Sequence, residues 1–203
     1  VEKYGFVWVC PTAADSQDAG LQLDEHLGEM RHTLAWLNLD RHHLFKSKLK
    51  TWRCNWKILG EGALETYHFA RAHRKTIAPF FVNNTSAIDN LNGHHRVVLP
   101  TKAVATMSKK DKEARSLRQM SHILVALMPQ SSFLVQENHV DWIRVNPLSV
   151  NCSEIHITSL NPIRPENRPT TQEIEVLKKF EEGLKEYGEI LDFGSDSRFF
   201  YMA

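Results

Sequence analysis

Residues 122–158 read HILVALMPQSSFLVQENHVDWIRVNPLSVNCSEIHIT, and this stretch decides the fold. It contains four short runs rich in apolar and β-branched residues, at 122–128, 132–136, 140–145 and 153–158. Turn-forming residues separate the runs, among them Pro129-Gln130 and Asn146-Pro147. Short strands joined by such turns are typical of an antiparallel meander. The stretch therefore predicts an antiparallel sheet.

Other elements are expected on both sides of this sheet. Alternating patterns predict strands over 4–10 and 44–54, and apolar residues at helical spacing predict helices over 21–37, 55–73 and 170–187. Residues 11–18, 83–93 and 161–169 have loop composition, and 108–118 has that of a solvated, charged helix face. This order indicates an α+β fold in which the antiparallel sheet curls around a long C-terminal helix. A ligand cavity is expected between sheet and helix.

The composition is that of one ordinary globular domain. Of the 203 residues, 42% are hydrophobic and 24% are charged, which excludes disordered and collagen-like chains. The 25 basic residues nearly balance the 24 acidic ones, so the net charge gives no reason to expect nucleic acid or an anionic membrane as the partner. We expect a single domain over residues 1–203 that acts on a small molecule.

The cysteines bear on the cellular compartment. Cys10, Cys54 and Cys152 are too few and too scattered for a disulfide framework. This usage fits the reducing cytoplasm, where we expect the protein to be. No apolar run reaches the roughly 18 residues of a membrane-spanning helix. Because Val1 lies directly before an expected strand, we also expect a further segment upstream.

Four possible metal ligands or acid–base groups lie close together in sequence, namely Glu61, Glu65, His68 and His73. The first three follow the i, i+4, i+7 spacing of one helix face, but His73 would point roughly 140° away from His68 on an ideal α-helix. Both histidines can bind one metal only if the backbone departs from α geometry. We therefore predict a π-type bulge, of a kind common at functional sites, or an unwound turn after His68. On spacing alone, two structural histidines remain the alternative.

The residues around this cluster resemble a known family. Cys54-Asn-Trp-Lys57, Glu61, Glu65-Thr-Tyr-His68 and His73 are similar to the signature of the Rieske-type aromatic-ring-hydroxylating oxygenases, in the catalytic domain of their large subunit. Further similarity lies in the opening Tyr4-Gly-Phe-Val-Trp-Val, in Leu127-Met-Pro-Gln130 and in Glu182-Gly-Leu184. The resemblance thus covers most of the chain.

The resemblance implies the helix-grip fold of START and Bet v 1 proteins. It also implies a mononuclear Fe(II) held by His68, His73 and Glu173, a ligand set that leaves positions open for dioxygen. Glu173 has a second interpretation, because Thr170-x-x-Glu173 is a capping box in which the glutamate would bind a backbone amide. Glu175 and Glu166 are the reserve carboxylates.

By the same resemblance, three other positions have expected roles near the iron site. Glu65 is the catalytic carboxylate that hydrogen-bonds His68 and links the iron to a Rieske cluster in the neighbouring subunit of a homotrimer. Gly62 stands where the family usually has Asn beside the iron. Tyr67 either lines the site or belongs to the core.

The electron source is expected outside this chain. A Rieske [2Fe–2S] cluster needs two Cys and two His, in the family's motifs C-x-H and C-x-x-H, and neither motif occurs here. We expect that an upstream Rieske domain has been removed and that an NAD(P)H-dependent reductase serves as electron-transfer partner. The predicted activity is the use of O₂ to hydroxylate an aromatic or similar organic substrate.

Two other functions remain open on the sequence. One is a helix-grip binding module for an apolar small molecule, in which His68 and His73 are structural and no iron binds. The other is a hydrolytic zinc site, since two His and one carboxylate also suit zinc. The His-Glu-x-x-His helix of many zinc proteases is absent from the sequence, which ranks the zinc site last.

Overall fold

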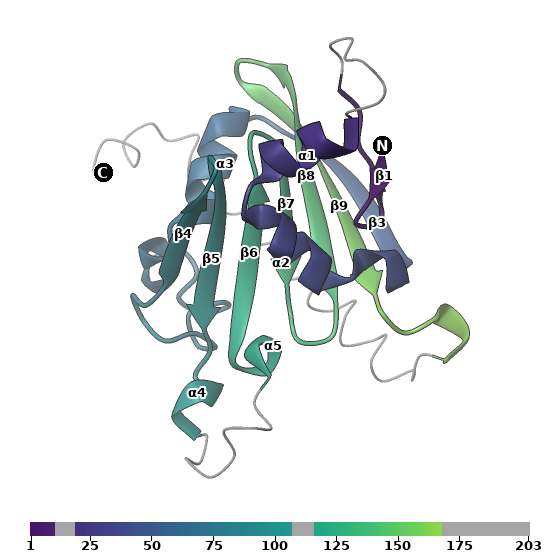
Figure 1. Ribbon diagram of the computed structural model, residues 1–203. Helices are drawn as coiled ribbons and strands as arrows, with labels where there is room; N and C mark the ends of the chain where they lie inside the picture. Colours follow the sequence, from purple (N-terminus) through teal and green to yellow (C-terminus); the bar gives the residue numbers. More distant parts are fainter. Residues whose placement is uncertain (11–18, 107–115, 168–203) are drawn as a thin grey trace.

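The computed structural model describes residues 1–10, 19–106 and 116–167, and its main feature is an antiparallel sheet of seven strands (Figure 1). The strand order is β3-β9-β8-β7-β6-β5-β4. Their bounds are β3 His43–Trp52, β4 Ala87–Leu91, β5 His94–Pro100, β6 Ser121–Leu127, β7 Ser131–Val135, β8 Val140–Ser149 and β9 Cys152–Asn161. The four strands predicted over 122–158 are confirmed as β6 to β9, and the α+β class is confirmed with them.

The β4–β5 hairpin corrects the predicted loop at 83–93. Asn92 and Gly93 form its turn with φ values of 56° and 81°, the left-handed pair that a tight hairpin turn requires. β4 is an edge strand, where polar residues such as Asp89 and Asn90 are tolerated. Asp89 Oδ2 also accepts from Arg96 Nη2 at 2.7 Å across the hairpin. The polar composition of β4 is therefore the reason why a loop was predicted in its place.

One face of the sheet is covered by two helices, α1 Ala19–Leu27 and α2 Met30–Leu37, where one helix over 21–37 was predicted. The helix breaks at Gly28, whose φ is +52° and whose missing Cβ would lie 2.8 Å from the side chain of Asn92. The core beneath joins Leu23, Leu27, Met30, Leu34, Leu37 and Leu39 to Ile123, Val125, Leu127, Phe133, Val135 and Val140. These residues form the largest apolar cluster among the described residues.

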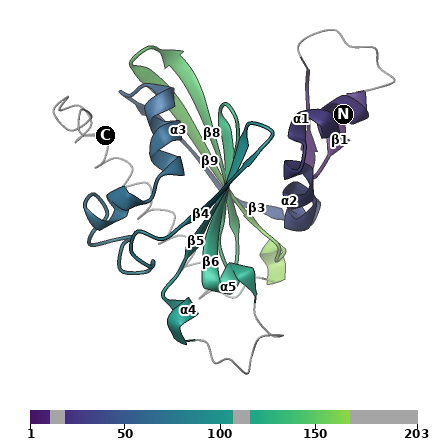
Figure 2. The ribbon, with the colours of Figure 1, turned by 60° about the vertical axis from the view of Figure 1, so that its left-hand side comes forward.

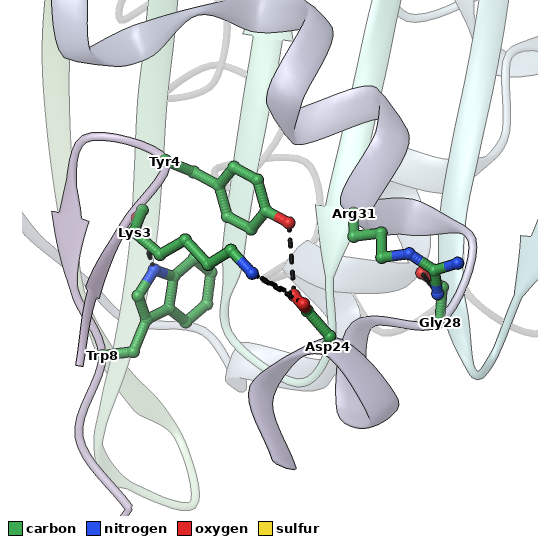
Figure 3. A network of polar contacts seen from close by, with 6 residues as sticks. All are labelled: Lys3, Tyr4, Trp8, Asp24, Gly28 and Arg31. Carbon is green, nitrogen blue, oxygen red and sulfur yellow. Dashed lines mark hydrogen bonds and ion pairs between the residues drawn. The ribbon is translucent and has the colours of Figure 1, made fainter. Parts of the chain in front are cut away.

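The amino terminus is a small hairpin, β1 Glu2–Lys3 and β2 Phe6–Val7, so the single strand predicted over 4–10 was wrong. Tyr4 and Gly5 make its turn, both with positive φ. The hairpin is fastened to α1 because Asp24 accepts from Lys3 Nζ at 2.6 Å and from the Tyr4 hydroxyl at 3.2 Å (Figure 3). The Lys3 ammonium lowers the pKa of the Asp24 carboxyl.

The opposite face of the sheet carries the helix α3 Trp56–Leu64 and the short η2 Tyr67–Ala70 (Figure 2). Two smaller apolar clusters hold this side, one around Trp52, Ile155 and Ile157 and one around Phe81, Val97, Leu99 and Leu124. The remaining short helices are η1 Leu39–Arg41, α4 Ala103–Thr106, α5 Leu117–Met120 and η4 Pro165–Asn167. The helix predicted over 170–187 lies outside the described residues. Among the described helices, none has both the length and the apolar character that a membrane crossing requires.

His94 connects β5 to the helical layer and is only 3% exposed. Its Nδ1 accepts from the Met128 N–H at 3.1 Å, and its Nε2 lies 3.2 Å from the His26 carbonyl oxygen, to which an Nε2–H would donate. Burial, helped by His26, lowers the pKa of His94 below its ordinary value. The folded protein therefore holds His94 as the neutral ring.

This lowered pKa predicts a loss of stability in acid. The unfolded chain takes up a proton at about pH 6.5, whereas folded His94 does so only at lower pH, so the free energy of unfolding falls as the pH drops below about 6.5. The variant H94N keeps an acceptor for the Met128 N–H but does not titrate. Urea denaturation at a series of pH values should give H94N a shallower decline than the wild type; parallel declines would contradict the assignment.

Candidate functional site

The helix α3 leads into the site, and residues next to its two ends determine where it begins and where it ends. Asn55 caps its start, accepting from the Lys57 N–H at 2.9 Å, and also donates to the Val150 carbonyl oxygen at 2.6 Å. The helix ends at Leu64, and Glu65 is extended with φ −107° and ψ 150°. The helix predicted over 55–73 is therefore nine residues long, Trp56–Leu64. The predicted departure from α geometry is present, but it begins at Glu65, before His68 rather than after it, and continues in the tight turn of η2.

Both carboxylate oxygens of Glu65 turn toward His68. Oε2 accepts from the His68 backbone N–H at 3.2 Å, which caps the η2 turn in the manner of an N-terminal helix residue. Oε1 contacts Nδ1 of the His68 ring. The contact does not meet the geometry of a hydrogen bond, since His68 Nδ1 has no such partner among the described residues, but a carboxylate beside one ring nitrogen is common behind metal-binding histidines that use the other nitrogen.

His73 lies beside His68 despite the interval of five residues. The ring centroids are 5.1 Å apart, and the ring planes meet at 63°. The His73 N–H donates to the Phe69 carbonyl oxygen at 3.1 Å, so a helical turn resumes after η2 and carries His73 around to its neighbour. The structure thus brings together Glu65, His68 and His73.

The electrostatics favour a neutral His73. Burial, assisted by the nearby His68, lowers the pKa of His73 to about 4, and its exposed fraction is 4%. A neutral imidazole has a lone pair for a metal ion at physiological pH, whereas a protonated ring has none. The ring is therefore in the protonation state that metal binding needs.

Phe69 was not among the predicted site residues, yet it contacts both histidines. Its ring centroid is 4.8 Å from that of His68 and 5.8 Å from that of His73, and on its other side it is 5.7 Å from Phe81. Phe69 thus connects the histidine pair to the apolar cluster on β5 and β6. Only its position between the two histidines marked it in the sequence.

Other candidates take no part in this arrangement. Glu61 is exposed, and Tyr67 is 60% exposed, so the core interpretation of Tyr67 was wrong. Glu173 and Glu175 lie outside the described residues, and Glu166 lies in the exposed η4, 3.9 Å from Arg164. Across residues 1–10, 19–106 and 116–167, no group of three His, Cys, Asp or Glu side chains is placed to hold one metal ion.

Gly62, expected beside the iron, sits in α3 with open space around it. A Cβ built there meets no atom within 4 Å. Because glycine inside a helix is less favourable than alanine by about 0.5–1 kcal/mol, G62A should raise the free energy of unfolding by about that amount in urea denaturation. Gly93, at φ +81°, is the control, and G93A should lower it. A loss of stability in G62A would contradict this placement.

The comparisons with known proteins identify the family of the chain. The family model for the catalytic domain of the ring hydroxylating alpha subunit matches residues 34–182, well over half of the chain. A comparison with the curated proteins gives no match. The matched segment includes Glu65, His68, His73 and the position of Glu173.

Solved structures of one oxygenase share the fold. The quaternary ammonium Rieske monooxygenase CntA in complex with the inhibitor MMV12 is similar with a TM-score of 0.66 and 12% identity, over 84% of this chain and 43% of that one. CntA in complex with its substrate L-carnitine is similar with a TM-score of 0.64 and 13% identity, over 88% and 46%. The chain spans less than half the length of these proteins. With the family model matched over most of its length, the chain belongs to the ring-hydroxylating oxygenases, in the catalytic domain of their alpha subunit.

Proposed function

We propose that this chain is a mononuclear non-haem iron oxygenase domain that uses O₂ to hydroxylate an aromatic or similar organic substrate. The observation that carries the proposal is the juxtaposition of His68 and His73, with the Glu65 carboxylate behind His68. A buried imidazole with a pKa well below neutral beside a half-buried one suits Fe(II). Family membership supports the same chemistry.

The third ligand in this proposal is Glu173. Residues 170–187 would form the long helix of a helix-grip fold and bring Glu173 to the face of the sheet that carries α3. Two imidazoles and one carboxylate would hold the iron and leave its remaining positions open. When bound, the iron supplies the activation of dioxygen that the protein's own side chains lack.

The chain's own residues would prepare this site. Glu65 holds the His68 backbone through Oε2 and places Oε1 against Nδ1 of the ring, which would leave Nε2 for the metal. Phe69 packs beside both histidines and Phe81 packs against Phe69, and these apolar rings would keep water away, which would strengthen electrostatic interactions there. Burial keeps His73 without a proton.

Electrons would come from outside the chain. In this proposal the assembly is a homotrimer, and a Rieske cluster in the neighbouring subunit is reduced by an NAD(P)H-dependent partner. Glu65 would be the link across that interface, with one oxygen kept on His68. The free cysteines Cys10, Cys54 and Cys152 agree with a reducing cytoplasm as the location.

Anaerobic reconstitution with Fe(II), followed by metal analysis, tests the proposal. We expect about one iron per chain for the wild type, because His68, His73 and Glu173 together would bind one ion. E173A should lose stoichiometric iron if Glu173 is a ligand, and keep it if Glu173 only caps a helix. A wild type that retains no iron would contradict the oxygenase and favour a metal-free binding module.

A further inference from the structure

A cavity lies on the face of the sheet opposite α3. It has a volume of about 530 Å³, within the range of small-molecule sites. Its walls come from the amino-terminal hairpin, the end of α1, the loop between β6 and β7, and strands β8 and β9. Figure 2 places the hairpin and α1 across the sheet from α3. This cavity is therefore separate from the histidine pair.

Aromatic rings form one side of this cavity. Phe6 lies 4.7 Å from Trp142 and 5.4 Å from Phe133, measured between ring centroids. Trp8 also lines the cavity, and its Nε1 donates to the Lys3 carbonyl oxygen at 2.8 Å, which fixes the indole (Figure 3). A planar apolar group would meet rigid rings here, with little loss of side-chain freedom.

Arg144 provides the charge in the same cavity. Its guanidinium carbon lies 4.3 Å from the centre of the Trp142 ring, and its Nη2 contacts His156 Nδ1. His156 Nε2 lies 2.9 Å from Ser47 Oγ. His156 with the proton on Nε2 satisfies both contacts, because Nδ1 then accepts from the guanidinium and Nε2 donates to the hydroxyl. The guanidinium is thus held in place before any ligand arrives.

The guanidinium has no anion of its own in the part of the chain that the structure describes. No carboxylate there lies within ion-pair distance of Arg144, and its Nε is buried without a hydrogen-bond partner among those residues. Glu154 also lines the cavity, but it lies opposite Asn146, two residues further along the strands than the Arg144–His156 pair. A half-buried, oriented guanidinium without a carboxylate is a ready site for a planar anion.

We propose that this cavity binds a small molecule with an aromatic ring and a carboxylate. The ring would lie among Phe6, Trp8 and Trp142, and the carboxylate would bind Arg144. Glu154 would repel a second acidic group on the ligand. The site lies across the sheet from the proposed iron site and does not depend on it.

Calorimetric titration of the full chain with naphthoate, and with naphthamide as the uncharged counterpart, tests this proposal. We expect naphthoate to bind at least about tenfold more tightly, because hydrogen bonds between charged partners are stronger than neutral ones. R144Q should abolish that preference, and R144K should retain part of it. R41Q, at an exposed arginine outside the cavity, should bind as the wild type does.

The five tryptophans locate the ligand. Naphthoate should shift the indole N–H resonances of Trp8 and Trp142, and should leave those of Trp52 and Trp56, beside α3, unchanged. H68A should bind naphthoate like the wild type, and R144Q should take up iron like the wild type. The proposal for this cavity and the proposal for the iron site can therefore be disproved independently. Equal affinity for the two probes, no binding at all, or shifts confined to Trp52 and Trp56 would overturn the proposal.

Discussion

H73A is expected to lower the affinity for Fe(II) by more than the roughly 10–100-fold that loss of an outer-shell partner costs. His73 would supply one of two imidazoles to the ion, its ring lies 5.1 Å from that of His68, and its pKa of about 4 keeps it neutral. Anaerobic titration with Fe(II) and metal analysis of the desalted protein measure the effect. H68A should behave in the same way.

Two further variants separate this effect from general damage. E65Q should cost the roughly 10–100-fold expected of an outer-shell group, because the amide can still contact His68 but lacks the charge. H32A removes an exposed histidine on α2 and should bind iron normally. Since His73 is buried, the thermal unfolding of H73A must be measured alongside. A folded H73A that binds iron like the wild type would contradict the proposed ligand.

The second large effect is expected from F133A, which should lower the free energy of unfolding by about 3–5 kcal/mol. Phe133 is 1% exposed and lies in the core between the sheet and α1 and α2. Truncation removes its ring contacts with Phe6 and Trp142 and leaves a cavity. Urea denaturation measures the change. L148A, at a side chain 53% exposed on β8, is the control and should cost little; a loss below about 1 kcal/mol in F133A would contradict this core.

The central strands were predictable because their signal is local. β6 to β9 combine apolar runs with turn residues, and each turn joins neighbouring strands. The β4–β5 hairpin was missed because Asp89 and Asn90 have loop-like composition and only their place at the sheet edge makes them a strand. The break at Gly28 depends on Asn92, which is distant in sequence. Such tertiary contacts leave no periodic pattern.

The sequence was enough to predict that the backbone near His68 and His73 leaves α geometry, but not where or how it does so. The interval between His68 and His73 demanded a departure from α geometry if the rings were to meet, and they do meet. The sequence did not say that the departure begins at Glu65, whose carboxylate replaces a helical hydrogen bond at the His68 N–H. Apart from its position between the two histidines, nothing in the sequence indicated Phe69, whose contacts depend on where the unwound turn places it against Phe81.

The iron environment itself is the most direct test of the proposed function. X-ray absorption at the iron edge of the Fe(II)-reconstituted protein reports the number of imidazoles on the metal. We predict two imidazoles on the iron of the wild type and one on any iron that H68A retains. Iron without imidazole ligands, or a spectrum that H68A leaves unchanged, would contradict it.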